Sequence, residues 1–518
     1  MVPRKVDYSL YLVTDPYLVP NGTTLEEQVQ KAIDGGVTLV QLREKDAETC
    51  DFIARAKAIQ AITKKAGVPL LINDRVDVAL AIDADGIHIG QEDIDVATAR
   101  KLLGSDKIIG MSVSYVSEAA KAVEDGVDYV GIGAIYDTAT KKPKKPPIGI
   151  NGVRKVLSYL SSVPRYVATV AIGSLNLKTA RNVVHLSAVP GRRLDGIAVV
   201  SAITAAKDPT AVSRELLGLV RDTPYWMSVV PNRDVSSVLA EVPVVISKVR
   251  LETPFVHNII NRVATNFAAN VNLAIGSSPA MSENTPEFDD FAGIPNSALL
   301  INMGFGTDDW VETYLAAAGA YAKKLRPVVL DPVAAGASEL RKGAVKSLLN
   351  WCHFDIIKGN EGEIFSIAGE ASQMRGVDST SNSQLQKKAN VIEALASKEK
   401  TIVILTGKED LISDGMTTFV LRNGHGYLAD ITASGCVLGS IVGAMVAVSL
   451  HDRFLAAVAG VLLYTIAAER AAVAPGVRGP GTFIGALIDE LYILSKATAD
   501  GDVSWLESAR LERYVEEA

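Results

Sequence analysis

The stretch Val37-Thr-Leu-Val-Gln-Leu-Arg-Glu-Lys45 decides how the first half of this chain is interpreted. Its apolar start predicts a buried strand, and polar side chains gather where that strand ends. Arg43 can hold phosphate oxygens through two parallel hydrogen bonds, and Lys45 adds a mobile positive charge. Taken alone, the segment is more typical of a solvated loop whose charges pair with one another. The surrounding pattern therefore has to decide between the two interpretations.

Outward from this stretch, strand-like runs alternate with Ala-rich amphipathic stretches. The expected strands cover residues 8–14, 37–42, 69–73, 86–89, 107–113, 129–136, 166–172 and 196–202. The helical candidates include residues 25–34, 54–66, 96–103, 116–125 and 210–220. Eight strands, each followed by a helical stretch, in about 220 residues are typical of a TIM (β/α)8 barrel. In that fold the active site lies at the C-terminal ends of the strands.

Polar residues follow nearly all of these runs, as that fold would require. Asp74 and Asp93 leave strand ends on the same rim, where they could share a hard cation through oxygen. Arg43 and Lys45 could bind a diphosphate held on that cation. A second phosphate could be bound by the hydroxyls of Thr138 and Thr140, the ammonium of Lys141, and backbone amides at Gly173, Val200 and Ser201.

Six segments of this half resemble thiamine phosphate synthase. They are Tyr11–Asp15, Gln41–Lys45, Ile72–Asp74, Gly86–Asp93, Thr138–Lys141 and Val199–Ile203, in order within residues 8–222. The family joins 4-amino-2-methyl-5-(diphosphomethyl)pyrimidine to a thiazole phosphate and releases pyrophosphate. One departure is Asp137, which stands where we expect proline.

The resemblance implies roles for individual residues. The pyrimidine diphosphate is assigned to Gln41, Leu42, Arg43, Glu44, Lys45, Asn73, Ser112 and Lys141. Magnesium is assigned to Asp74 and Asp93, and the thiazole phosphate to Thr138, Thr140, Gly173, Val200 and Ser201. Among these, Arg43, Lys45 and Lys141 are the expected catalytic groups, because they can stabilise the departing pyrophosphate by preorganised charge. A side-chain nucleophile is not required.

The pattern changes after residue 221, where prolines and turn formers predict a boundary near residue 230. We therefore expect one domain over residues 1–230 and another over 231–518. In the second, apolar runs over residues 298–302, 327–330, 354–357 and 401–405 alternate with helical stretches over 310–325, 343–350 and 384–397. This order predicts an open α/β sheet with ligands beyond its strand ends.

The segment Asp430-Ile-Thr-Ala-Ser-Gly-Cys436 precedes a long apolar stretch. Residues 433–450 carry no charge, and their serines and glycines favour a buried helix over a membrane span. The start of such a helix can bind an anion through its free amides. A thiol in the first turn is expected to have a lowered pKa and could act as a base. The alternative is that Cys436 is a packed, inert cysteine.

Four segments of this half resemble hydroxyethylthiazole kinase, of the ribokinase-like superfamily. They are Pro254–Asn270, Gly276–Met281, Leu330–Gly336 and Asp430–Cys436, within about residues 245–490. The resemblance implies a thiazole pocket at Asn258, Met281 and Ala433, ATP binding at Arg341, Thr406 and Gly435, and magnesium at Asp331 and Glu363. Cys436 would replace the usual catalytic aspartate, and Ala433 stands where we expect glycine. These kinases are trimers, so we expect a homo-oligomer, a trimer or a multiple of it.

Composition narrows the remaining possibilities. The 518 residues carry a net charge of −7, which gives no polybasic surface for nucleic acid or an anionic membrane. Three widely spaced cysteines favour a reducing compartment, so we expect a cytoplasmic protein. We expect a bifunctional enzyme of thiamine biosynthesis that uses Mg²⁺, ATP and small-molecule substrates. The alternatives are a kinase half that acts on the pyrimidine alcohol, and a sensor in which one half has lost catalysis.

Overall fold

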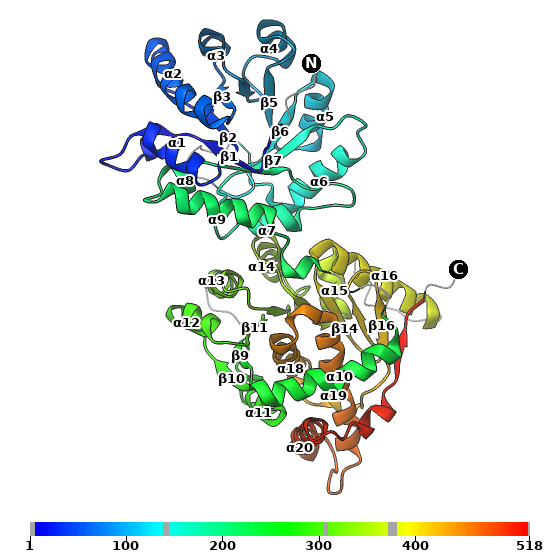
Figure 1. The fold of residues 1–518 in the computed structure, drawn as a ribbon. Coiled ribbons are helices and arrows are strands. Elements are labelled where there is room, and N and C mark those ends of the chain that lie inside the picture. Colours follow the sequence, from blue (N-terminus) through cyan, green and yellow to red (C-terminus); the bar gives the residue numbers. More distant parts are fainter. Residues whose placement is uncertain are drawn as a thin grey trace. The chain divides into compact units, whose positions relative to one another are not determined.

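The computed structural model describes residues 6–137, 145–228, 230, 233–304, 309–370 and 381–515, without the side chains of residues 381–383. It divides into two compact units between Pro224 and Tyr225. The boundary expected from the sequence lies a few residues further along the chain. Figure 1 colours the first unit from blue to green and the second from green to red.

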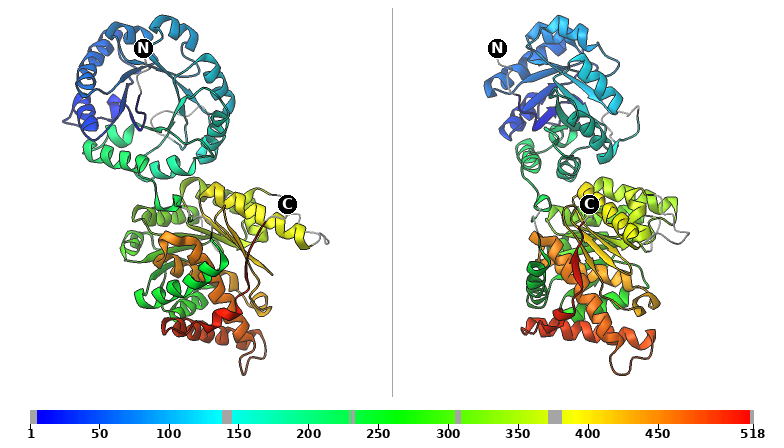
Figure 2. Two further views of the ribbon diagram at one scale, coloured as in Figure 1. Left: turned by 45° about the vertical axis from the view of Figure 1, so that its right-hand side comes forward. Right: turned by 90° about the vertical axis from the view of Figure 1, so that its right-hand side faces the viewer.

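The first unit is a closed barrel of parallel strands surrounded by helices, which confirms the expected fold (Figure 2, left). The strands are β1 (Leu10–Val13), β2 (Leu39–Leu42), β3 (Leu70–Asn73), β4 (Gly86–Ile89), β5 (Ile108–Val113), β6 (Tyr129–Ile132), β7 (Ala168–Ile172) and β8 (Gly196–Val199). The helices are α1 (Leu25–Asp34), α2 (Thr49–Ala66), α3 (Val76–Ile82), α4 (Val96–Leu103), α5 (Val116–Asp125), α6 (Gly149–Ser161), α7 (Ala180–Leu186), α8 (Ser201–Thr204) and α9 (Pro209–Arg221). Each strand pairs in parallel with the next, and β1 also pairs with β8.

Capping residues define where the barrel helices begin and end. Thr24 and Glu27 form a capping box at the start of α1, since each side chain accepts a hydrogen bond from the other's backbone. The side chains of Asp95 and Asp208 accept amide hydrogen bonds at the starts of α4 and α9. Gly67 ends α2 in the left-handed conformation, with φ of 71°. Local sequence therefore defines the ends of these helices.

A tyrosine ring fills part of the barrel interior beside a glycine. The centroid of the Tyr129 ring lies 5.1 Å from that of Tyr8 and 5.9 Å from that of Tyr11. A Cβ atom at Gly110 would lie 2.0 Å from carbons of the Tyr129 ring. A Cβ atom at Gly131 would lie 3.3 Å from the His88 ring. The barrel interior accommodates these rings because the neighbouring strands carry no side chain at those positions.

The second unit is built on one mixed sheet. Its strand order is β10-β9-β11-β12-β13-β14-β15-β16-β17, parallel from β10 to β14 and antiparallel beyond. These strands are β9 (Phe255–Ile259), β10 (Ser278–Met281), β11 (Ser297–Asn302), β12 (Val328–Asp331), β13 (Ile356–Asn360), β14 (Ile402–Thr406), β15 (Asp410–Ser413), β16 (Thr418–Leu421) and β17 (Leu511–Arg513). The open α/β sheet is as expected, whereas the antiparallel strands were not anticipated.

Helices cover both faces of this sheet (Figure 1). One face carries α10 (Val235–Glu252), α11 (Thr265–Ile275), α18 (Ser434–Val448), α19 (Arg453–Ala472) and α20 (Pro480–Ala499). The other carries α12 (Phe288–Gly293), α13 (Trp310–Lys323), α14 (Glu339–Trp351), α15 (Glu361–Ala368) and α16 (Ser381–Glu399). Within β11, Leu300 packs against the first group of helices, and Leu299 and Ile301 pack against the second group. Because successive side chains enter two different hydrophobic cores, the strand is apolar on both faces.

Two long, buried helices, α18 and α19, lie in one core. The segment Leu450–Ala472 is long and apolar enough to cross a membrane, yet 89% of its apolar 18-residue stretch is buried inside the unit. Residues Val437–Met445 of the preceding helix are fully or nearly fully buried as well. The expectation that residues 433–450 form a packed helix is therefore confirmed.

The segment that follows the first unit is anchored on the second. Tyr225 donates from its hydroxyl to an Asp355 carboxylate oxygen at 2.9 Å. The Trp226 ring stacks on His353 with centroids 4.2 Å apart, and its carbonyl accepts a hydrogen bond from Arg453 at 2.7 Å. These contacts explain why the division falls before Tyr225.

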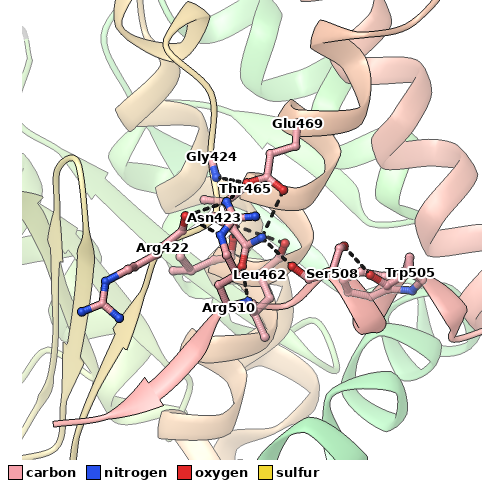
Figure 3. Close-up of polar contacts among 10 residues, drawn as sticks. Arg422, Asn423, Gly424, Leu462, Thr465, Glu469, Trp505, Ser508 and Arg510 are labelled. Carbon is pink, nitrogen blue, oxygen red and sulfur yellow. Dashed lines mark hydrogen bonds and ion pairs between the residues drawn. The ribbon is translucent and has the colours of Figure 1, made fainter.

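A cluster of polar contacts fixes the last strand (Figure 3). The Glu469 carboxylate on α19 accepts from the Gly424 amide at 2.7 Å, from Asn423 at 3.1 Å and from Arg510. The Arg510 amide in turn donates to the Asn423 side chain at 2.7 Å. Strand β17, which begins at Leu511, is thereby held against β16.

Substitution of Gly110 by alanine should destabilise the first unit selectively. The added methyl group would overlap the Tyr129 ring, and such overpacking costs about 1–3 kcal/mol. The tryptophans all lie in the second unit, at positions 226, 310, 351 and 505. In urea titrations, Gly110→Ala should therefore lower the urea midpoint of the first unit, followed by circular dichroism. The midpoint of the second unit, followed by tryptophan fluorescence, should stay unchanged.

Gly218→Ala is the matched control, because its nearest neighbour would be the flexible Asp222 side chain at 3.4 Å on helix α9. Equal circular-dichroism midpoints for Gly110→Ala and Gly218→Ala would contradict the close approach of Gly110 to the Tyr129 ring.

Candidate active sites

One cavity of about 410 Å³ in the first unit gathers residues from many strand ends. The predicted site residues that line it are Gln41, Arg43, Lys45, Asn73, Asp93, Ser112, Gly173, Val200 and Ser201. They lie at or just beyond the C-terminal ends of β2, β3, β4, β5, β7 and β8. Thr138, Thr140 and Lys141 lie outside the described residues. The barrel thus brings together, in one cavity, most of the predicted site residues that lie far apart in the sequence.

Two predicted residues turn away from this cavity. Leu42 is fully buried and does not line it. Glu44 forms an ion pair with Arg55 on α2 at 2.7 Å. Neighbouring strand residues point to opposite faces, so Gln41, Arg43 and Lys45 point inward and Leu42 and Glu44 outward.

Asp74 and Asp93 form a carboxylate pair beside the cavity. Asp74 has a left-handed backbone with φ of 61°. Burial, then a hydrogen bond with Asp93 and its charge, raises the pKa of Asp74, while Lys45 at 3.5 Å opposes that rise. The Asp93 carboxylate also accepts from the Gly90 amide at 2.7 Å.

This pair fits a magnesium ion. Two carboxylates that share a hydrogen bond need a proton or a cation between them. Protein magnesium sites commonly use one or two carboxylates and leave the remaining positions to water and substrate phosphates. Among the described residues, no group of three or more histidine, cysteine or acidic side chains could hold a metal. Water and substrate phosphates would complete the coordination.

Gly173 is needed for its shape. Its φ is +116°, and a Cβ atom there would lie 2.7 Å from the Ile135 amide nitrogen. A side chain would therefore block the close approach of the segment after β6, which leads to Thr138 and Thr140. Gly173 also lines the cavity.

The sequence analysis did not assign Tyr11, His88 or Tyr129 to the site. Tyr11 and His88 line the cavity, and Tyr129 lies behind its wall. Hydrogen bonds join all three to Gln41 and Ser112. The sequence signal that could have identified this group is His88, a polar residue at an inward-facing position within strand β4.

In the second unit, polar side chains meet where α18 begins. Asn302 at the end of β11 donates to Asp331 at the end of β12, at 2.8 Å. Asn261 donates to Asn302 at 2.9 Å and to the Cys436 sulfur at 3.4 Å. Lys358 on β13 lies 3.3 Å from Asp331. The predicted Asp331 and Cys436 are therefore part of one continuous cluster.

Lys358 is the main residue of this cluster that the sequence analysis left without a role. Its side chain is 3% exposed, and it donates to the Gly435 carbonyl at 2.7 Å. Burial raises the pKa of Asp331 to about 6, although the positive charge of Lys358 opposes the rise. Lys358 thus holds a positive charge between a buried carboxylate and the first turn of α18.

The sequence analysis predicted a lowered pKa for the Cys436 thiol, and this prediction is wrong. Burial, and then the negative charge of Asp331, raises the pKa of the Cys436 thiol, although Lys358 and hydrogen bonds act in the opposite sense. Position in the first turn predicted a lowered value. Desolvation of the thiolate outweighs the helix terminus here.

The predicted ATP-binding and second magnesium residues make protein contacts. The Arg341 guanidinium donates to the carbonyls of Met303, Val333 and Gly304. The Thr406 hydroxyl donates to the Gly359 carbonyl at 3.3 Å. Glu363 accepts amide hydrogen bonds from Asn360 and from Ala334, both at 2.9 Å. All three lie near strand ends, and their hydrogen bonds order the loops there.

The predicted thiazole residues lie on two neighbouring strands. Asn258 and Met281 are register partners in β9 and β10. Asn258 is 1% exposed and accepts from Ser440 on α18 at 2.6 Å, whereas Met281 is half-buried. Ala433 precedes α18 with a left-handed φ of 65°, which explains why glycine is expected there.

The comparisons with known proteins agree with this architecture. The family "Thiamine monophosphate synthase" matches residues 10–203, and the family "Hydroxyethylthiazole kinase family" matches residues 246–497. A probable thiamine biosynthetic bifunctional enzyme of Schizosaccharomyces pombe is 46% identical over 98% of this chain and 99% of its own length. The thiamine biosynthetic bifunctional enzyme of Saccharomyces cerevisiae is 41% identical over 95% of this chain and 96% of its own length. A thiamine-phosphate synthase of Chloroflexus aurantiacus is 47% identical over 42% of this chain and 95% of its own length.

The barrel, the α/β sheet and their two polar sites define a bifunctional transferase. The chain belongs to the family of bifunctional thiamine biosynthetic enzymes. It combines thiamine-phosphate synthase activity with hydroxyethylthiazole kinase activity, as the sequence analysis expected. The kinase activity implies ATP as a substrate.

Proposed function

We propose that the barrel cavity binds the pyrimidine diphosphate against Arg43 and Lys45, with magnesium held by Asp74 and Asp93. The observation that carries this proposal is the shared cavity. Side chains from widely separated segments line it, among them Arg43, Lys45 and Asp93, and Asp74 contacts Lys45 and Asp93 beside it. Gln41, Asn73 and Ser112 supply neutral hydrogen-bonding groups for the same substrate.

The condensation follows from charge stabilisation. The bond between the pyrimidine methylene carbon and the diphosphate oxygen breaks, and the oxygen keeps the electron pair. Arg43 and Lys45 stabilise the departing pyrophosphate by preorganised charge. The thiazole nitrogen then forms a bond to the electron-deficient methylene carbon. Bound magnesium would supply further neutralisation of the diphosphate oxygens.

The thiazole phosphate is assigned to the part of the cavity wall that follows β7 and β8. Gly173, Val200 and Ser201 follow β7 and β8, and all three line the cavity. Gly173 lines the cavity without a side chain, so a phosphate can approach its backbone closely. Thr138, Thr140 and Lys141 complete this proposal from the sequence alone.

Asp74→Asn should reduce thiamine-phosphate synthase activity by about a hundredfold or more, since it removes one of two magnesium-binding carboxylates. The assay supplies thiazole phosphate and follows thiamine phosphate by mass spectrometry over a magnesium titration. Hydroxyethylthiazole kinase activity of the same preparation should be unchanged.

The matched control is Asp77→Asn, an exposed aspartate paired with Arg75 on the barrel surface. Retention of synthase activity and of its magnesium response in Asp74→Asn would refute this assignment. Loss in both variants would point to a general effect on the barrel.

For the second unit, we propose that the cluster at the start of α18 transfers phosphate from ATP to the thiazole alcohol. Arg341, Thr406 and Gly435 are assigned to ATP, and Asp331 and Glu363 to magnesium. Asn258, Met281 and Ala433 are assigned to the thiazole. The supporting observation is that Cys436, Asp331 and Lys358 meet at the first turn of a buried helix. The free amides of that turn favour a transferring phosphoryl group.

Cys436 is assigned as the base for the substrate hydroxyl. Because the pKa of its thiol is raised, the thiolate is scarce near neutral pH, and most of the rate enhancement must come from positioning and charge. Cys436→Ala should therefore slow the kinase by about a hundredfold and not abolish it. The measurement is ADP formation with hydroxyethylthiazole, beside synthase turnover with supplied thiazole phosphate.

Cys352→Ala provides the control, because burial raises the pKa of that thiol to about 12 and it lies away from the cluster. A Cys436→Ala kinase as fast as the parent would reject the base assignment. Failure of the parent chain to form thiamine phosphate from either thiazole compound would favour the sensor interpretation.

We also propose a homo-oligomer, a trimer or a multiple of it. The supporting observation is exposed apolar surface near the predicted thiazole residues: Val263 is 67% exposed and Leu273 is 61% exposed, before and within α11. A second copy is a natural cover for such side chains. Light scattering should give a mass that is a multiple of three times 54.9 kDa. A monomer at micromolar concentration would refute the proposal.

A further inference from the structure

Side chains from five strands form a continuous hydrogen-bonded chain inside the barrel. Gln41 Nε2 on β2 donates to the Tyr11 hydroxyl on β1 at 2.5 Å. That hydroxyl lies 2.8 Å from the Tyr129 hydroxyl on β6. The Tyr129 hydroxyl lies 2.7 Å from His88 Nδ1 on β4, and His88 Nε2 lies 2.8 Å from Ser112 Oγ on β5. The two ends of the chain, Gln41 and Ser112, are residues assigned to the pyrimidine diphosphate.

The proton positions in this chain follow from the orientation of the Gln41 amide, whose Nε2 faces the Tyr11 hydroxyl. Tyr11 accepts from Gln41, so its single proton is available for Tyr129. Tyr129 then donates to His88 Nδ1, and the Nε2 proton of the neutral imidazole points to Ser112 Oγ. In the opposite direction Tyr129 would donate to Tyr11, and the Tyr11 proton would need the Gln41 carbonyl oxygen as its acceptor, which requires the flipped amide. With the Gln41 amide oriented as in the structure, the forward direction satisfies every proton in the chain.

We propose that this buried chain sets the hydrogen-bond polarity of the pyrimidine pocket. At one end, Gln41 uses its NH₂ group internally and presents its carbonyl oxygen to the cavity. At the other end, Ser112 accepts from His88 and presents its own proton. The inference rests on the proposed assignment of Gln41 and Ser112 to the pyrimidine diphosphate.

This polarity matches the substrate at both ends. The 4-amino group of the pyrimidine is a donor, so it pairs with the Gln41 carbonyl oxygen. The diphosphate oxygens are acceptors, so one pairs with the Ser112 hydroxyl. A glutamine that was free to rotate would offer either group, because its two ends have almost the same shape. The chain therefore selects the 4-amino pyrimidine over an analogue with the opposite polarity.

Tyr129 acts through other residues. Its side chain is fully buried and does not line the cavity, whereas Tyr11, His88, Gln41 and Ser112 all do. It is therefore a positioning residue that can be changed without removing a substrate contact. Gly110 leaves the space that its ring occupies.

The decisive variant is Tyr129→Phe, which removes one oxygen and keeps the ring. The Tyr11 proton then loses its acceptor and turns toward Gln41, which favours the flipped amide. We expect the KM for the pyrimidine diphosphate to rise about tenfold, as for loss of one neutral hydrogen bond, while the KM for thiazole phosphate stays constant. Preference for the substrate over its 4-oxo analogue, as substrate or inhibitor, should fall by a similar factor.

Tyr8→Phe is the matched control, since Tyr8 packs on the same ring with centroids 5.1 Å apart but lies outside the chain. It should keep the parent KM and the parent selectivity. His88→Gln is a second variant that can retain a donor for Ser112 and cuts the chain from Tyr129. It should relax selectivity in the same direction, even if Tyr129→Phe folds poorly.

A double-variant cycle separates a connected chain from independent contacts. Tyr11→Phe together with Tyr129→Phe should change selectivity no more than Tyr11→Phe alone, because both interrupt one chain. Full additivity, or equal selectivity in Tyr129→Phe and Tyr8→Phe, would overturn the inference. These outcomes differ from failure of the proposed function, in which Asp74→Asn would keep its synthase activity.

Discussion

Closure of the barrel is the constraint on which the first active site depends. Because β1 pairs with both β2 and β8, the strands form one ring and their C-terminal ends form one rim. Pleating then sends every second residue inward, so Gln41 faces the cavity while Leu42 faces the helices. Arg43 and Asp93 come from distant segments and reach one cavity only because of this closure.

The second active site depends on a different arrangement, in which charge is buried at a helix start. Asp331 and Lys358 are both almost fully enclosed, and Asn302 completes the hydrogen bonding of the carboxylate. Removal of one partner from such a pair is far costlier than its net stabilising contribution suggests. The pair therefore fixes the geometry between β12, β13 and α18 more than it adds to stability.

Much of the architecture could be predicted because it is encoded in local patterns. Alternating strand and helix runs and polar strand ends identified both folds, and the pairing of Asp74 with Asp93 followed from barrel geometry. The antiparallel strands β15, β16 and β17 were not anticipated, since each has only three or four residues. The pKa of Cys436 depended on burial and on Asp331, which the sequence does not place beside it. Tyr129 and Lys358 look like ordinary strand residues until their partners from other strands are known.

The late pairing of β17 has a consequence for how the protein is made. Strand β16 ends at Leu421, and its antiparallel partner begins only at Leu511. A ribosome that adds about 5–20 residues per second needs on the order of ten seconds to synthesise the intervening chain. During that interval the edge of β16 lacks the strand and the Arg510 contacts that later cover it. Unpaired edges accept strands from other molecules, so neighbouring nascent chains on one messenger RNA are the nearest competitors for this position.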